Sequence, residues 1–537
     1  MSTLVTLDWI VVGLYFLAVF GIAWWVIRQK QRSTEDYFLA GKNVGWFVVG
    51  ASLFASNIGS EHLVGLAGTG AESGVVFGHL EFQASLVLLL LGWLFVPFYT
   101  RSGVFTMPEF LERRYSPAAR WYLSVISVVG YVLTKICVTI YAGGVVFETL
   151  MGIDFWTGAL AIVVLTGIYT VLGGLRAVVY TEVLQSAVLL AGAVAVTAIG
   201  LAKVGGWGAL YDTVGSEYFN VWKPISHPDF PWTGMVFGAP IIAIWYWCTD
   251  QFIVQRTLAA RNETEARRGT IFAGFLKQLP LFIFIVPGMI AYALSLKGEI
   301  DLPQADRALP TLVMVLLPVG LRGLVAAGLL AALMSSLSAV FNSSSTLITM
   351  DFYKKLHPGA SERQLIHIGR LSTVILVGLG LLWIPLMQTI SGTLYLYLQS
   401  VQSYISPPIA AVFLLGVFSK RITATAAISA LVGGFAIGML RLIAEINKAS
   451  LDGVLLTFAS INFLHFAIFL FLFCVVGMVV VSSFTKAPSE EQLAGLTFET
   501  TSSSEKEKSR ATWSTLDVAL SAILVAVVVA IVLYFTG

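Results

Sequence analysis

The sequence predicts an all-helical protein that crosses a membrane about fourteen times, and three observations support this prediction. The mean hydropathy of the 537 residues is +0.85. Only 12% of the residues are charged, whereas soluble proteins carry about 25%. Apolar runs of about 20 residues, the length that a helix needs to cross the hydrocarbon core, recur along the whole chain. We place these runs roughly at 8–28, 45–72, 77–99, 120–150, 154–172, 180–203, 233–255, 270–296, 320–350, 369–388, 392–417, 422–445, 458–482 and 514–536.

The first run, 8–28, is interpreted as a permanent first helix. The first 30 residues lack both the basic n-region and the small-residue cleavage site of a signal peptide. Most of the 32 Lys and Arg residues fall in connections that share one side, such as those containing Arg113 and Lys354. Because basic connections stay in the cytoplasm, we expect a multi-pass protein of the cell membrane with both termini outside.

The chain is predicted to be one transport domain, 1–482, followed by a mobile polar cytoplasmic linker, 483–513, and a last helix, 514–537. Within the domain we expect a core at 45–417 built from two inverted repeats, 45–203 and 233–417. Each repeat opens with an interrupted helix, the first at Asn57–His62 and the second at Gly238–Pro240. Matching interruptions in two halves are typical of inverted-repeat transporters.

The first interruption is the most informative stretch of the chain. Polar residues between Ser56 and His62 lie almost consecutively inside an apolar run. Polar or irregular backbone at membrane depth is tolerated only where it is buried in protein or lines a watery cavity. We therefore expect solute and ion to bind here. His62 is equally consistent with a satisfied interior imidazole and with a partner for a solute hydroxyl.

Four ionisable side chains interrupt other predicted helices. Such groups are costly in a membrane and are functional candidates by default. Glu81 and Lys277 can present an acceptor and a donor to a polyhydroxylated solute, or each can pair with a neighbour. For Lys135 we favour a structural ion pair, and for Asp250 a network at a helix end.

Tyr246 and Trp247 fall in the middle of a predicted helix. They can form a packing cluster or an interfacial belt, or they can stack on a pyranose ring and gate it. Farther along, Gln399 precedes Pro407 and Pro408, which disturb their helix. Its neutral amide suits sugar hydroxyls, although it can equally bond a freed backbone group.

Ser335 and Ser336 lie three and four residues after Ala332, on one helical face. Together with carbonyls of Ala55 and Ile58, freed where the first core helix unwinds, they can form an oxygen-only site for a small hard cation. The alternative is common, since Ser in membrane helices often bonds the preceding turn or lets helices approach closely.

Other chemistries are not expected. Cys137, Cys248 and Cys474 all fall in predicted helices, so we expect no disulfide framework. The six His residues lack transition-metal spacing, and the net charge of +2 suggests no nucleic-acid partner. Without a nucleophile–base constellation, we predict neither an enzyme nor an organic cofactor.

Several long segments resemble the sodium/solute symporter family, and within it the sodium–glucose and sodium–myo-inositol cotransporters. They cover most of residues 40–425 and read ASLFASNIGSEHLVGLAGTG, GWLFVPFYTRSGVFTMPEFL, WYWCTDQFIVQRTLAA, AALMSSLSAVFNSSSTLITMDFY and SPPIAAVFLLGVFSKR. The resemblance implies a leucine-transporter-type core of five plus five inverted helices, with extra helices at both ends.

The resemblance also implies roles for individual residues. Sodium would be held by the backbone carbonyls of Ala55, Ile58 and Ala332 and by the hydroxyls of Ser335 and Ser336. The solute would be bound by Asn57, His62, Glu81, Tyr246, Trp247, Lys277 and Gln399, with Tyr246 as inner gate.

Two departures from the family pattern limit what is carried over. Members with a second sodium use an Asp in the fifth core helix and hydroxyl residues just after the Ser pair. Here the Asp position holds Glu182, and the two later positions hold Ser338 and Ala339. We therefore expect one sodium per solute. Ala243 replaces a polar residue of glucose-type members, and residues 60–62 and 395–399 look closer to inositol-type carriers.

These observations predict sodium-coupled import of a neutral sugar, glucose-like or galactose-like, by alternating access. A cyclic polyol such as myo-inositol is the alternative solute. Two other classes remain open: an uncoupled sugar facilitator and a membrane sugar sensor. Beyond solute, sodium and the lipid bilayer, the sequence indicates no partner.

Overall fold

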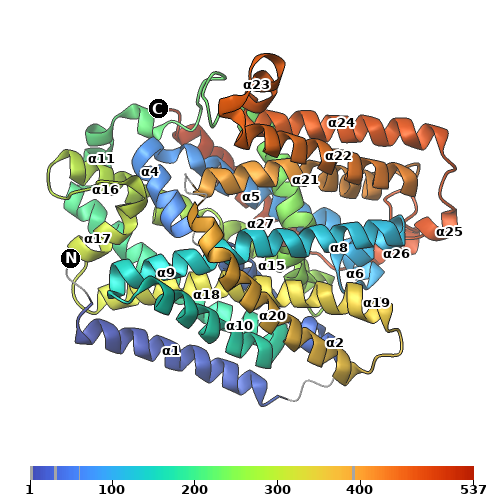
Figure 1. The fold of residues 1–537 in the computed structure, drawn as a ribbon, viewed down its shortest axis with the longest axis horizontal. Helices are drawn as coiled ribbons and strands as arrows, with labels where there is room; N and C mark the ends of the chain where they lie inside the picture. The colour runs from blue at the N-terminus through green and yellow to red at the C-terminus, as the bar shows by residue number, and fades with distance from the viewer. Residues whose placement is uncertain (1–3, 30–32, 60, 390–393) are drawn as a thin grey trace.

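The computed structural model describes residues 4–29, 33–59, 61–389 and 394–537 and shows an all-helical protein (Figure 1). This confirms the predicted fold class. Within the described ranges, ten helical stretches are long and apolar enough to cross a membrane, and one of them, Phe155–Val204, contains two helical parts separated by a kink. Each of the predicted apolar runs overlaps a helix. In order, the main ones are α1 (Thr6–Ile27), α3 (Trp46–Asn57), α4 (Ala67–Ser73), α5 (Gly78–Leu90), α6 (Val96–Ser102), α8 (Pro117–Tyr131), α9 (Cys137–Met151), α10 (Phe155–Val204), α12 (Trp232–Phe237), α13 (Ala239–Ile244), α14 (Gln251–Leu258), α15 (Glu263–Leu276), α16 (Val286–Leu296), α18 (Leu321–Leu347), α20 (Glu362–Thr389), α21 (Leu394–Phe418), α22 (Ala424–Ile446), α24 (Phe463–Phe484) and α27 (Thr515–Tyr534).

Short irregular or π-helical segments join several of these helices. Four of them are η2 (Glu61–Leu66), η5 (Val132–Ile136), η7 (Trp245–Thr249) and η8 (Leu281–Ile285). π-helical turns of this kind are frequent at functional sites, and two of these segments, η2 and η7, carry residues that we predicted to bind solute.

The two predicted runs 154–172 and 180–203 are two helical parts, which the label α10 covers together and a sharp kink separates. The bend lies at Gly174, whose φ is +56°. A Cβ atom there would lie 2.5 Å from the carbonyl oxygen of Tyr37. Gly174 is therefore required both by its backbone conformation and by the close approach of the chain before α3.

The first predicted interruption is present, and the second lies later than expected. The helix α3 ends at Asn57, and Ile58 is extended with ψ of 100°. The second interruption was expected at Gly238–Pro240, but Gly238 keeps right-handed helical angles. Pro240 lies in the first turn of α13, where the missing N–H costs nothing. The backbone leaves helical geometry at Asp250 instead, with ψ of 125°.

The centre of the bundle is α18, which is buried over nearly its whole length and packs along α10. In Figure 1, α1 lies along one edge of the bundle, and α22 and α24 lie along the opposite edge. Much of the surface of α1, α24 and α27 is exposed. These helices therefore surround the buried elements that carry the predicted site.

The segment expected to be a mobile linker, 483–513, packs against the bundle. It contains two short helices, α25 (Glu490–Leu493) and α26 (Ser503–Arg510). The ring of Phe498 contacts Phe98 at a centroid distance of 4.9 Å and stacks on Phe418 at 5.3 Å. The Phe498 N–H donates to the carbonyl of Val417. The ring of Trp513 also packs on Trp93 at a centroid distance of 5.5 Å. The polar composition of the segment suggested a mobile linker because it did not reveal these aromatic contacts.

Candidate functional site

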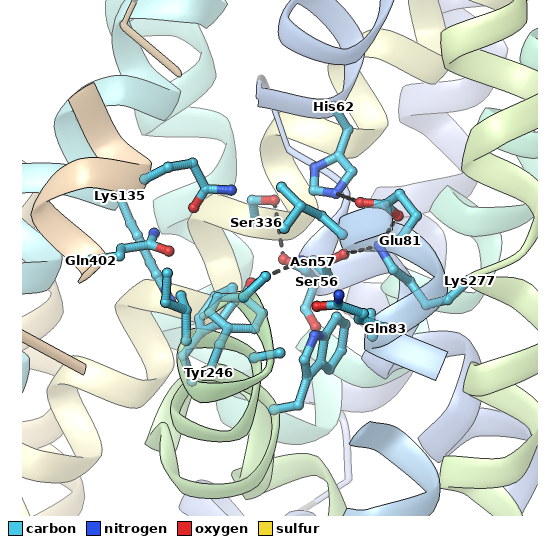
Figure 2. Close-up of a pocket in the computed structure, with 18 of the residues that line it drawn as sticks. Ser56, Asn57, His62, Glu81, Gln83, Lys135, Tyr246, Lys277, Ser336 and Gln402 are labelled. Atoms are coloured by element: carbon cyan, nitrogen blue, oxygen red, sulfur yellow. Dashed lines mark hydrogen bonds and ion pairs between the residues drawn. The ribbon is translucent and has the colours of Figure 1, made fainter. Parts of the chain in front are cut away.

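A cavity of about 120 Å³ lies where the interrupted helix α3 meets α5, η5, η7, α18 and α21 (Figure 2). The structure brings all of the predicted solute-binding residues to its wall, although they come from distant parts of the chain. They are Asn57, His62, Glu81, Tyr246, Trp247, Lys277 and Gln399. The wall also contains Ser56, Gln83, Lys135, Thr139, Ser336 and Gln402.

Four of these residues form a buried polar chain. Lys277 forms an ion pair with Glu81, and its Nζ donates to Asn57 Oδ1 over 2.5 Å. On the other side of the Glu81 carboxylate, His62 Nε2 lies 3.3 Å from Oε1. All four residues are at most 7% exposed. Burial of an unpaired charge is costly. The ion pair therefore allows Glu81 and Lys277 to be buried inside the membrane-spanning region.

The aromatic residues of η7 close another side of the cavity. Asn57 Nδ2 donates to the hydroxyl of Tyr246 over 3.0 Å, which connects the interruption of α3 to η7. The ring of Trp247 lies 5.2 Å from that of Tyr246, nearly perpendicular to it. Lys277 Nζ lies 5.5 Å from the Trp247 ring centre. Tyr246 and Trp247 thus lie in the cavity wall, in contact with Asn57 and Lys277.

Lys135 and Asp250 form the structural pair and the helix-end network that the sequence predicted. Lys135 Nζ lies 2.9 Å from Asp250 Oδ2. The other carboxylate oxygen of Asp250 accepts from the hydroxyl of Tyr131 and from the N–H of Phe252. Asp250 therefore caps the first turn of α14.

Ser336 connects α18 to the interruption of α3. Its Oγ lies 3.2 Å from the carbonyl oxygens of both Ser56 and Ile58. These carbonyls are available because the helix ends at Asn57 and its last carbonyls have no partner within the helix. Ile58 and Ser336 were predicted sodium ligands, whereas the second carbonyl here is that of Ser56. Ala55 and Ala332, the other predicted carbonyl ligands, are buried on the same two helices.

Ser335 and the residues of the doubtful second sodium site belong to a neighbouring network. Ser335 Oγ donates to Glu182 Oε1 over 3.4 Å, and Ser52 also donates to this carboxylate. Glu182 forms an ion pair with Arg256 at 3.1 Å, and both side chains are fully buried. Ser338 donates to the Ser335 carbonyl within its own helix. The charge of Glu182 is thus already matched by a guanidinium of the protein.

Two amide residues of the cavity wall were missed from the sequence. Gln83 follows Glu81 by two residues, and its Nε2 donates to the carbonyl of Met235. Gln402 lies three residues after Gln399, on the same helical face. Both are neutral polar residues inside apolar runs, and this was the signal that identified Gln399. Ser60 and the side chains of 395–398, which suggested an inositol-type carrier, lie outside the described residues.

Comparisons with known proteins agree with this arrangement. The model of the sodium:solute symporter family matches residues 37–434. Sodium/glucose cotransporter 1 of Oryctolagus cuniculus is 39% identical over 92% of this chain and 81% of its own length. Sodium/glucose cotransporter 4 of Homo sapiens is 39% identical over 91% of this chain and 77% of its own length.

Solved structures confirm the leucine-transporter-type fold. The outward-open, substrate-bound state of a Na⁺-coupled sialic acid symporter superposes with a TM-score of 0.79 at 22% identity, covering 90% of this chain and 99% of that one. The nucleobase–cation symporter Mhp1 in a closed conformation gives a TM-score of 0.53 at 15% identity, over 85% of this chain and 97% of that one. The chain belongs to the sodium:solute symporter family: it is a multi-pass membrane protein that couples solute movement to sodium, and it is not an enzyme.

Proposed function

We propose that this symporter imports a neutral hexose, glucose-like or galactose-like, together with sodium by alternating access. The observation that carries the proposal is the convergence of the seven predicted solute-binding residues on one cavity. Beside that cavity, Ser336 contacts the freed carbonyls of α3. The sodium/glucose cotransporters that share 39% identity with this chain support the same solute class.

The electrostatics of the cavity favour a neutral solute. Among the described residues of its wall, Glu81 is paired with Lys277, and Lys135 is paired with Asp250. A charged solute would need an opposite charge in the cavity wall, but these charged groups already neutralise one another. Amides and hydroxyls can instead exchange hydrogen bonds with sugar hydroxyls, and the ring faces of Tyr246 and Trp247 can contact the apolar faces of a pyranose ring.

The proposed sodium site explains why ion and solute bind together. Sodium at Ala55, Ile58, Ala332, Ser335 and Ser336 would hold α3 and α18 together, and oxygen-only ligation suits this ion. Asn57, on the last turn of α3, contacts both Lys277 and Tyr246. An ion that fixes the end of α3 therefore orders the solute pocket, and the solute must raise sodium affinity by the same factor.

One sodium per solute is the stoichiometry that the surroundings of Glu182 favour. A second cation near this carboxylate would have to compete with Arg256, whose guanidinium lies 3.1 Å away in a site without solvent exposure. Glu182 and Ser338 are therefore proposed as parts of the structural network around the sodium site rather than as a second ion site.

A cyclic polyol such as myo-inositol is the second candidate solute. Ala243 lines the cavity with a methyl group, so it provides no hydrogen bond at this position to a hexose hydroxyl.

Uptake of radiolabelled glucose, galactose and myo-inositol into proteoliposomes, with sodium or potassium outside, separates the candidates. Accumulation of glucose or galactose above equilibrium in sodium alone supports the proposal, and preference for myo-inositol replaces the hexose. Equal uptake in both salts indicates a facilitator, whereas binding without uptake indicates a sensor.

We also propose that both termini face the outside of the cell membrane, because the basic connections gather on the other side. An epitope tag fused to either end is then cleaved by protease added to intact cells. Protection of both tags until the cells are lysed would reverse the proposed orientation.

A further inference from the structure

We propose that Lys135 is a positioning residue that holds the gate residue Tyr246 in its closed position. This inference rests on the proposed function, in which Tyr246 moves when the solute is released inward. It concerns a residue that the sequence suggested only as half of a structural pair.

Among the described residues, Tyr246 is held from at least two other elements. Its hydroxyl accepts from Asn57 Nδ2 over 3.0 Å. Its ring lies beneath Lys135, whose Nζ is 4.5 Å from the ring centre. In the view of Figure 2, Tyr246 lies between the labelled residues Asn57 and Lys135. The position of the tyrosine ring therefore depends on the interruption of α3 and on η5 together.

The ammonium group of Lys135 is itself fixed by several contacts. It lies 3.9 Å from the ring centre of Phe252 and 5.2 Å from that of Tyr131. Its ion pair with Asp250 at 2.9 Å is almost fully buried, with exposed fractions of 15% and 2% for the two side chains. Cation–π contacts are strongest where the cation is desolvated. Lys135 is thus a fixed charge, rather than a mobile surface group that happens to face an aromatic ring.

The partner of Lys135 lies at the point where the gate segment must bend. Asp250 ends η7 and begins α14, and its backbone is extended. The same carboxylate caps α14 through the Phe252 N–H and accepts from Tyr131. One charge pair therefore joins η5 to both the Tyr246 ring and the hinge that follows it. Breaking this pair would release the ring and the hinge together.

The chain provides a reporter that does not depend on any solute. Cys248 lies in η7 two residues after Tyr246, and its side chain is fully buried against the carbonyl of Val87. A buried thiol reacts only when its segment moves, because the reagent must reach it. With Cys137 and Cys474 replaced by Ala, alkylation of Cys248 by N-ethylmaleimide reports movement of the gate segment.

The test compares Lys135→Met with Lys135→Arg in this single-cysteine protein. Because Lys135→Met leaves the Asp250 carboxylate buried and unpaired, the double variant Lys135→Met/Asp250→Asn is included, in which Asn still caps α14. Lys42→Met is the matched control, since Lys42 also lies over an aromatic ring, Phe105, and pairs with Glu35.

We expect both Met variants to be alkylated at Cys248 at least roughly fivefold faster at a temperature well below unfolding, and to leak sodium into liposomes without sugar. Lys135→Arg and Lys42→Met should behave like the unaltered protein. Unchanged alkylation and leak in the Met variants, or a lower melting temperature as their only effect, would overturn the proposal. If the unaltered protein transports none of the tested sugars, the proposed function fails, while the alkylation rates still decide the role of Lys135.

Discussion

At the scale of single residues, the ion pair between Glu81 and Lys277 allows a test of whether these charges serve the stability of the bundle or the transport of solute. Removing one partner of a buried pair costs about 3–5 kcal/mol, because the other charge remains unpaired. We predict that Glu81→Gln and Lys277→Met each lower the melting temperature, and that the double variant recovers most of the loss. Sugar uptake should stay abolished in all three. Recovery of uptake in the double variant would show that the pair serves only the stability of the bundle.

The contact of Ser336 with two carbonyls leads to a second prediction. Its hydroxyl joins α18 to the interruption of α3, whereas the hydroxyl of Ser343 bonds the Ala339 carbonyl in its own helix. Ser336→Ala should raise the sodium concentration for half-maximal uptake at least tenfold, which corresponds to about 1.4 kcal/mol. Ser343→Ala should leave it within about twofold. The same sodium dependence in both variants would remove Ser336 from the ion site.

Charged residues in apolar runs could be recognised from the sequence, but their partners could not. Glu81, Lys277 and Lys135 each interrupt a predicted helix, and this cost singled them out. Lys135 and Asp250 are 115 residues apart, so only the fold brings the side chain of η5 to the start of α14. From the sequence, pairing with a neighbour and facing the solute were alternatives for Glu81 and Lys277. In the structure the two residues pair with each other and also line the cavity.

At the scale of helices, close packing depends on glycines. The hydrophobic pattern of the sequence did not reveal their role. The helix α4 lies directly against α16: a Cβ atom on Gly288 would be 2.0 Å from the carbonyl oxygen of Ala67. Backbone cannot move aside as a side chain can, so Gly288→Ala should destabilise the protein by at least about 1–3 kcal/mol. Gly13→Ala is the control, since its Cβ would meet nothing within 4 Å. Equal melting temperatures for the two variants would contradict this packing.

The helices themselves followed from apolar run length, but their bends did not. Run length correctly separated the helices at 154–172 and 180–203, but it did not show that the chain turns between them at Gly174 alone. The Gly-Ala-Pro sequence at 238–240 suggested an interruption, yet proline fits the first turn of α13. The actual interruption at Asp250 depends on a capping carboxylate, which the sequence showed only as a polar residue near a helix end.

At the scale of the whole molecule, the number of coupled ions sets how strongly the transporter can concentrate its solute. A membrane potential supplies about 2.3 kcal/mol per charge per 100 mV. A tenfold sodium gradient adds about 1.4 kcal/mol. One sodium therefore sustains an accumulation of several hundredfold, and two would sustain roughly the square of that. The pairing of Glu182 with Arg256 favours the smaller value.

The number of sodium ions per sugar can be determined from the sugar gradient at which net sugar flux is zero, and this requires no measurement of a rate. Proteoliposomes are given a fixed sodium gradient and a potassium-set voltage, and the sugar gradient is varied until net uptake stops. With one sodium per sugar, the balancing sugar ratio should rise tenfold for each tenfold rise in the sodium ratio at constant voltage. A hundredfold rise would require a second ion. Because the Glu182 carboxylate is the remaining acidic candidate beside Ser335 and Ser338 in the described network, that result would mean that Arg256 leaves this carboxylate during transport.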